Sequence, residues 1–302
     1  MPLTTKIQYK NFEPGEFADS AKRSFDETLS LIEKFPWADQ RDHLQVNLTN
    51  PSVTIADGNG TYLKLALFYS GKFVLHYLDA NLHLFTKSFT DYKESYPYIK
   101  AYFENPSFPT DDFKLENTWL QKNLVHFTDK DFRYSLTPQR IYAYLFSTSG
   151  INFILLLVFL VFMLLNPAKM ILPVVLLMIP FLFLLGGGLN LILFANYYRY
   201  AKGKTIIMSK GHNVFYFGDN DNPEQFNKTD ILQFKVYGNT KNSKSPIGGF
   251  LWIDIELKNA RHLVIPNLLI DSEDLTRKLF EYPCIQVTRG IPFIPSSAST
   301  PS

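Results

Sequence analysis

The sequence predicts an α+β membrane protein with an N-terminal α+β domain, a transmembrane helical hairpin and a C-terminal barrel-type sheet closed by a helix. Two uncharged stretches carry the membrane prediction, because no charged residue occurs from Ile141 to Ala168 or from Met170 to Tyr198. Short β-type runs separated by turn residues lie on both sides of these stretches, which is typical of antiparallel sheets. The formal net charge of the 302-residue chain is only +2, which argues against a nucleic-acid partner.

The N-terminal domain, residues 1–140, is predicted to begin with an amphipathic helix at 13–35, where apolar residues recur with a period close to 3.6. An antiparallel meander should follow, because turn residues divide the next segment into short runs. The predicted strands cover residues 44–48, 53–56, 62–69, 73–78 and 82–86. A short helix at 96–103 and a further strand at 131–135 complete the domain.

The uncharged region, residues 141–198, predicts spans at 146–165 and 171–194, since roughly 20 apolar residues cross a hydrocarbon core. Basic residues flank the hairpin at its outer ends, so the positive-inside rule places both polar domains in the cytoplasm. Tyr197, Tyr198 and Tyr200 fit an interfacial aromatic belt on that side. The predicted location is therefore the inner membrane, with two spans and with both termini cytoplasmic.

Packing within the hairpin is predicted from its few polar and small residues. Asn152 and Asn190 should lie at similar depths, which favours an interhelical hydrogen bond between them. Gly186, Gly187 and Gly188 would let the two helices approach closely.

The C-terminal domain, residues 199–283, again shows short strand patterns. They cover residues 205–208, 214–218, 231–237, 251–257 and 263–265. Asp271 is a suitable N-cap for a closing helix at 272–280. The tail at 284–302 is rich in proline and serine towards its end, which predicts disorder.

This C-terminal region resembles a known family. The segment Tyr198-Arg199-Tyr200 followed by Thr205 to Gly211, the step Thr229-Asp230-Ile231, and the hairpin before the closing helix look like a bacterial pleckstrin-homology-like (PH-like) domain attached to a membrane hairpin. The resemblance covers residues 197–282. It implies a binding platform for lipid head groups or proteins. The long loop from Gly238 to Gly249 departs from the family pattern.

Candidate contacts with anionic lipid head groups are basic residues beside the hairpin and in the long loop. They are Arg199, Lys202, Lys204, Lys241 and Lys244. His76 and His83 flank a turn, and the turn register decides whether they share a sheet face. Even together they supply only two metal ligands, so no metal site is predicted. No phosphate-binding loop, nucleophile elbow or other catalytic motif is present, and no cofactor is predicted.

The function predicted from the sequence is that of a membrane-anchored, non-enzymatic binding or scaffolding protein. Its two domains would present surfaces to a protein partner, to lipid, or to a second copy of the chain. One alternative is an accessory subunit of a larger membrane assembly, such as a transporter or secretion complex. A second alternative is an enzyme with an unrecognised site in residues 1–140.

Overall fold

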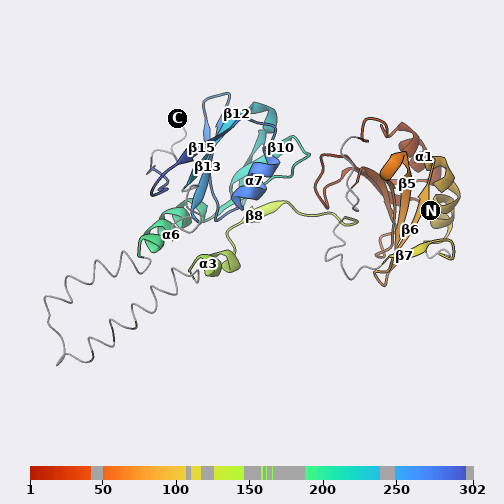
Figure 1. The fold of residues 1–302 in the computed structure, drawn as a ribbon, viewed down its shortest axis with the longest axis horizontal. Coiled ribbons are helices and arrows are strands. Elements are labelled where there is room, and N and C mark those ends of the chain that lie inside the picture. Colours follow the sequence, from red (N-terminus) through yellow and green to blue (C-terminus); the bar gives the residue numbers. More distant parts are fainter. Residues whose placement is uncertain are drawn as a thin grey trace. The chain divides into compact units, whose positions relative to one another are not determined.

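The computed structural model describes residues 1–41, 50–106, 110–116, 126–145, 188–238 and 249–296, together with Val158, Val161 and Leu165. The chain forms two compact units (Figure 1). Unit 1 contains Met1–Asp131 and the four residues Ser209–His212, and unit 2 contains Phe132–Met208 and Asn213–Ser302. The chain therefore returns briefly to unit 1 between two strands of unit 2.

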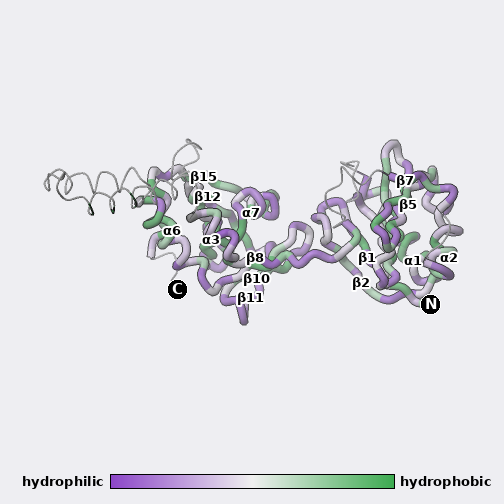
Figure 2. The backbone as a smooth tube through the Cα atoms, turned by 90° about the horizontal axis from the view of Figure 1, so that it is seen from below, coloured by the Kyte–Doolittle hydropathy of each residue, from purple (hydrophilic) through white to green (hydrophobic). Residues whose placement is uncertain are grey.

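Unit 1 is built on a seven-stranded sheet with the order β2-β1-β3-β4-β5-β6-β7, and all its neighbouring strands are antiparallel. Its strands are β1 (Leu3–Gln8), β2 (Ala18–Arg23), β3 (Ser52–Ala56), β4 (Tyr62–Leu67), β5 (Phe73–Leu78), β6 (Leu84–Phe89) and β7 (Lys114–Glu116). Hydrophobic and hydrophilic positions are interspersed along the strands of this unit (Figure 2). In β3, apolar Val53 and Ile55 alternate with polar Ser52 and Thr54. Such alternation gives the sheet two chemically different faces.

Helices α1 (Phe25–Lys34) and α2 (Tyr96–Glu104) pack on the apolar face of this sheet. Ile32 from α1 and Ile99 from α2 are completely buried there, in one cluster with Leu75. A capping box starts α1: the Ser24 side chain accepts from the Glu27 amide, and the Glu27 side chain accepts from the Ser24 amide.

The start of unit 1 differs from the predicted helix at 13–35. The structure has strand β2 and then the shorter helix α1, because the Ser24 cap begins the helix only at Phe25. Strand β1 was missed, and the strand predicted at 44–48 lies outside the described residues. The predicted strands at 53–56 and 73–78 and the predicted helix at 96–103 coincide with β3, β5 and α2.

The segment Ser209–His212 is held in unit 1 by a buried carboxylate. Glu16 Oε1 accepts from the backbone amides of Gly211 at 2.8 Å and His212 at 2.9 Å. Glu16 Oε2 accepts from the Glu13 amide at 2.8 Å, and the Glu16 side chain has no exposed surface. A Cβ atom on Gly211 would lie 2.2 Å from the ring of Phe12, so the close approach requires glycine.

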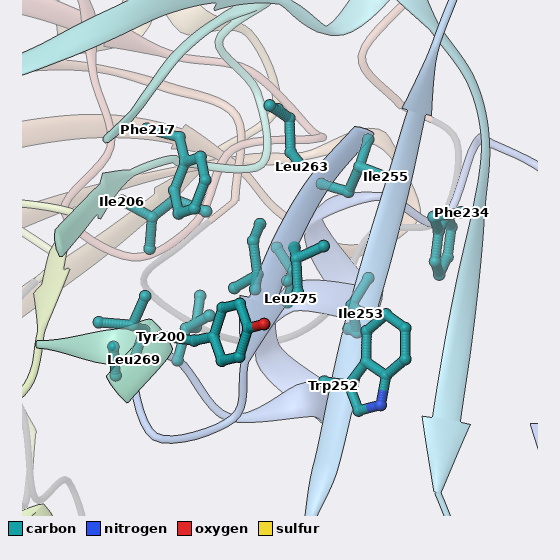
Figure 3. Close-up of a cluster of buried hydrophobic side chains, with 14 of the residues drawn as sticks. Tyr200, Ile206, Phe217, Phe234, Trp252, Ile253, Ile255, Leu263, Leu269 and Leu275 are labelled. Carbon is teal, nitrogen blue, oxygen red and sulfur yellow. The ribbon is translucent and has the colours of Figure 1, made fainter. Parts of the chain in front are cut away.

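Unit 2 contains two four-stranded sheets, with the orders β11-β10-β9-β8 and β14-β13-β12-β15. Its strands are β8 (Arg133–Ser135), β9 (Lys204–Ile207), β10 (Val214–Asp219), β11 (Asn222–Asn227), β12 (Ile231–Gly238), β13 (Leu251–Leu257), β14 (His262–Pro266) and β15 (Cys284–Thr288). Its described residues form the α-helices α3 (Pro138–Leu145), α6 (Gly188–Ala201) and α7 (Ser272–Lys278). Figure 3 shows Tyr200 of α6, Ile206 of β9 and Leu275 of α7 gathered in one buried cluster.

The predicted membrane hairpin is contradicted. Within the described part of the chain, no helix is long and apolar enough to cross a membrane. Helix α6 has 14 residues, or about 21 Å, against a hydrocarbon core of about 30 Å. Its residue Leu193, predicted inside the second span, is instead completely buried in the unit 2 core. Most of both predicted spans lies outside the described residues. The predictions of a membrane fold class, of transmembrane helices and of a multi-pass location in the inner membrane are therefore wrong.

Candidate peptide-binding surface of unit 2

Strand β15 lies at the edge of its sheet and pairs in parallel with β12. The register places Phe234 opposite Cys284 and Gly238 opposite Thr288. Two further backbone bonds extend the pairing, from Phe234 N to Pro283 O and from Arg289 N to Gly238 O, each 3.0 Å long. Four of the five β15 side chains are exposed, and Val287 is half-buried. Backbone hydrogen bonds therefore contribute more to this strand's attachment than side-chain burial does.

Beyond β15, the chain follows α6 and is bound by three of its side chains. The Asn196 side chain makes a two-way contact with Ile294: Nδ2 donates to Ile294 O at 3.1 Å, and Oδ1 accepts from Ile294 N at 3.0 Å. The Tyr197 hydroxyl donates to Pro292 O at 2.8 Å, and the Tyr200 hydroxyl donates to Pro295 O at 2.9 Å. All of these hydrogen bonds join side chains of α6 to main-chain atoms of the tail.

One tail side chain is nevertheless anchored. Ile294 is only 2 % exposed and belongs to the same buried cluster as Tyr197 and Leu193 of α6. Neighbouring Ile291 and Phe293 are 46 % and 37 % exposed. The surface therefore combines backbone hydrogen bonds along an extended segment with the burial of the Ile294 side chain. Sheet-edge peptide sites obtain affinity from main-chain bonds and specificity from individual side chains in the same way.

The spacing of apolar residues along α6 explains how it forms this surface. Leu193, Tyr197 and Ala201 recur every four residues and are completely buried, so one face of the helix packs on the core. The Tyr197 ring meets Phe250 edge-on, with centroids 5.1 Å apart. Burial raises the pKa of Tyr197, so its hydroxyl stays protonated and can donate to the tail.

The aromatic belt predicted from the sequence is therefore placed differently. Tyr197 and Tyr200 are buried against the protein and hydrogen bonded to the tail. The tail itself, predicted to be disordered from residue 284, contains β15 and the anchored Ile294. Alternating Ile285 and Val287 were the available sequence signal for the strand.

Three of the five predicted lipid-contact residues are described. Arg199 and Lys202 are exposed at the C-terminal end of α6. Lys204 begins β9, half-buried, with its Nζ 5.7 Å from the Phe217 ring centroid. Lys241 and Lys244 lie outside the described residues. Contact of these residues with lipid head groups stays a prediction.

The predicted hairpin-packing residues are only partly described. Asn190 and Gly188 are buried in α6. Asn152, Gly186 and Gly187 lie outside the described residues, so the predicted bond between the two asparagines is not tested.

The two histidines beside the predicted turn do not face one another. His76 pairs with Thr86 across β5 and β6. His83 instead lies at the turn, where its Nδ1 is 3.0 Å from Asp79 Oδ2. The Asp79 amide bonds to His83 O, so a three-residue loop separates them, a register that places the two histidines on opposite faces.

Comparison with known protein families finds a match that lies largely in unit 2. A family model for the PH domain matches residues 133–278, from the start of β8 to the end of α7. No curated protein and no solved structure matches the chain. Strand β15 and the anchored tail lie beyond the matched residues. The chain thus contains a PH-like domain, followed by a tail segment that occupies one edge of its sheet.

Proposed function

We propose that this chain is a non-enzymatic binding protein whose PH-like domain recognises an extended peptide segment of a partner protein. Residues 283–295 occupy the same surface in the isolated chain. A PH-like domain is typical of binding and scaffolding proteins. The observation that carries the proposal is the attachment of the tail along β12 and α6, through its backbone and the single buried side chain Ile294.

Three features favour a replaceable tail over a fixed strand. Its pairing with β12 is parallel, which is slightly less stable per residue than antiparallel pairing. Its strand side chains are mostly exposed, so little apolar area holds them in place. The tail also follows the residues that match the PH family model, so it is an addition to that domain.

The test replaces the anchor in the full-length chain. Ile294→Ser should weaken the tail's attachment by at least about 2 kcal/mol, since burial of a large aliphatic side chain is lost. A fluorescent peptide of residues 281–296 should then bind the variant saturably, measured by anisotropy. The wild-type chain should bind the peptide much more weakly, because its own tail competes at about millimolar effective concentration.

The matched control is Ile291→Ser, the same substitution at a residue that is 46 % exposed, and it should behave as wild type. A peptide that itself carries serine at position 294 should not bind. If the Ile294→Ser chain keeps its circular dichroism spectrum and binds no peptide, the surface does not recognise peptides. Loss of the unit 2 fold in that variant would instead show that the tail is an integral part of the domain.

A further inference from the structure

A row of buried polar side chains crosses the face of the unit 1 sheet opposite α1 and α2. Strand pairing places Lys6 opposite Thr54, Thr54 opposite Lys64, and Lys64 opposite His76. Directly opposed residues share a face, so the row runs over β1, β3, β4 and β5. Its members are 3 %, 0 %, 0 % and 8 % exposed. Ser52, two residues before Thr54 and therefore on the same face, is also completely buried.

Two ammonium groups contribute positive charge to this row. Lys64 Nζ donates to Gln8 Oε1 at 3.0 Å and to the His126 carbonyl at 3.4 Å. Burial, assisted by the charge of Lys6, lowers the pKa of Lys64 to about 7. Lys6 Nζ lies 3.0 Å from the exposed carboxylate of Asp129, and burial lowers the pKa of Lys6 as well. The region thus holds cations in surroundings that disfavour them.

Four buried polar atoms around these lysines have no hydrogen-bond partner within the described structure. They are Ser52 Oγ, Thr54 Oγ1, His76 Nδ1 and His126 Nδ1. Each such atom costs about 1–3 kcal/mol, and buried polar groups in folded proteins are otherwise nearly always bonded. Hydroxyl groups and neutral imidazole rings can donate hydrogen bonds. Four such groups beside two lysine side chains, which an anion would favour in their charged form, match the needs of an oxyanion.

We propose that this face of unit 1 binds a small oxyanion, such as a phosphate group, between the Lys64 ammonium, the hydroxyls of Ser52 and Thr54, and the imidazoles of His76 and His126. The site is independent of the peptide-binding surface of unit 2. Metal binding by the two imidazoles is disfavoured. Burial, and secondly the charge of Lys64, lowers the pKa of both His76 and His126, and the same surroundings would disfavour a metal cation.

The first test uses the Thr54→Val variant of the full-length chain and inorganic phosphate. Valine keeps the shape of threonine and removes a hydroxyl that has no partner, so without phosphate the variant should be at least as stable as wild type. Phosphate should raise the Tm of the wild-type chain saturably. The phosphate concentration dependence of this rise gives an apparent affinity. Thr54→Val should lower that affinity about tenfold or more, since a hydrogen bond to a charged ligand is lost.

The matched control is Thr5→Val on the opposite face of the sheet, where the hydroxyl already accepts from Arg23 at 2.7 Å. This variant should keep the wild-type apparent affinity for phosphate. The comparison also removes the general stabilisation that phosphate gives to any protein, because that effect acts on all variants. Equal apparent affinities for phosphate in wild type and Thr54→Val would contradict the proposed site.

A second test measures the number of protons that the protein takes up when it binds the anion. An oxyanion beside Lys64 should favour the charged ammonium, so binding at pH 8 should take up close to one proton. Titration calorimetry with sulfate in buffers of different ionisation enthalpy measures this number. Lys64→Met should abolish both binding and uptake, whereas Lys100→Met, at an exposed position on α2, should change neither. Sulfate binding without proton uptake, or binding that survives Lys64→Met, would contradict the assignment.

Discussion

Glu16→Ala should lower the free energy of unfolding of unit 1 by about 3 kcal/mol. The buried carboxylate accepts three backbone amides, those of Glu13, Gly211 and His212. Alanine supplies no acceptor, and each buried donor left without a partner costs about 1–3 kcal/mol before relaxation. Urea denaturation followed by hydrogen exchange of β4 peptides measures the change in unit 1 separately from unit 2.

Glycine at position 211 gives an independent check of the same contact. Gly211→Ala places a Cβ atom 2.2 Å from the Phe12 ring and 2.9 Å from Glu16 Oε1, so it should destabilise unit 1 by about 1–3 kcal/mol. Gly249→Ala, where an added Cβ meets nothing within 4 Å, is the matched control. Wild-type stability in both Glu16→Ala and Gly211→Ala would show that the segment Ser209–His212 is not held in this way.

The stability of unit 1 should rise steeply with pH above neutrality. Burial holds the pKa of Lys64 at about 7, against 10.5 in an unfolded chain. Between these values the unfolded state binds a proton that the folded state lacks. Stability should therefore increase by about 1.4 kcal/mol per pH unit within that window and be independent of this lysine below pH 7.

Neighbouring groups modify this profile in known directions. Lys6 has a lowered pKa and adds to the rise. His76 and His126, with pKa values lowered to about 3 and 4, destabilise the fold as the pH falls below about 6.5. In the Lys64→Met variant, the free energy of unfolding should rise much less between pH 7.5 and 9.5 than in wild type. The loss of stability below about pH 6.5 should remain. Urea denaturation at a series of pH values measures both. An unchanged slope in this variant would show that Lys64 keeps an ordinary pKa.

The strands of unit 1 could be predicted from sequence, but the burial of both sheet faces could not. Thr54, Lys64 and His76 each lie between apolar neighbours, a pattern that normally marks the solvent face of a half-buried sheet. In the structure, Phe127 is completely buried beside this face, in a cluster with Leu78 and Leu84. A covering residue so distant in the sequence leaves no periodic signal in the strands that it covers.

The candidate surface of unit 2 could not be predicted from amino-acid composition. The proline and serine content of the tail predicted disorder. Proline is nevertheless compatible with an extended segment at a sheet edge, because such a segment needs neither helical backbone nor an amide donor at every residue. The uncharged run before Tyr198 predicted a membrane span, although Leu193 and Tyr197 form one buried face of a 14-residue helix. A long apolar run cannot distinguish a helix packed on a sheet from one packed in lipid without knowledge of its neighbours.

Hydrogen exchange of the native chain tests most directly whether the tail occupies a recognition surface. The account predicts that the β15 amides exchange by local opening, at least about a hundredfold faster than those of β13 at the centre of the same sheet. Ile294→Ser should accelerate β15 further and leave β13 unchanged. If β15 and β13 exchange at the same rate and only through global unfolding, β15 is a permanent strand and the edge of β12 is not available to a partner.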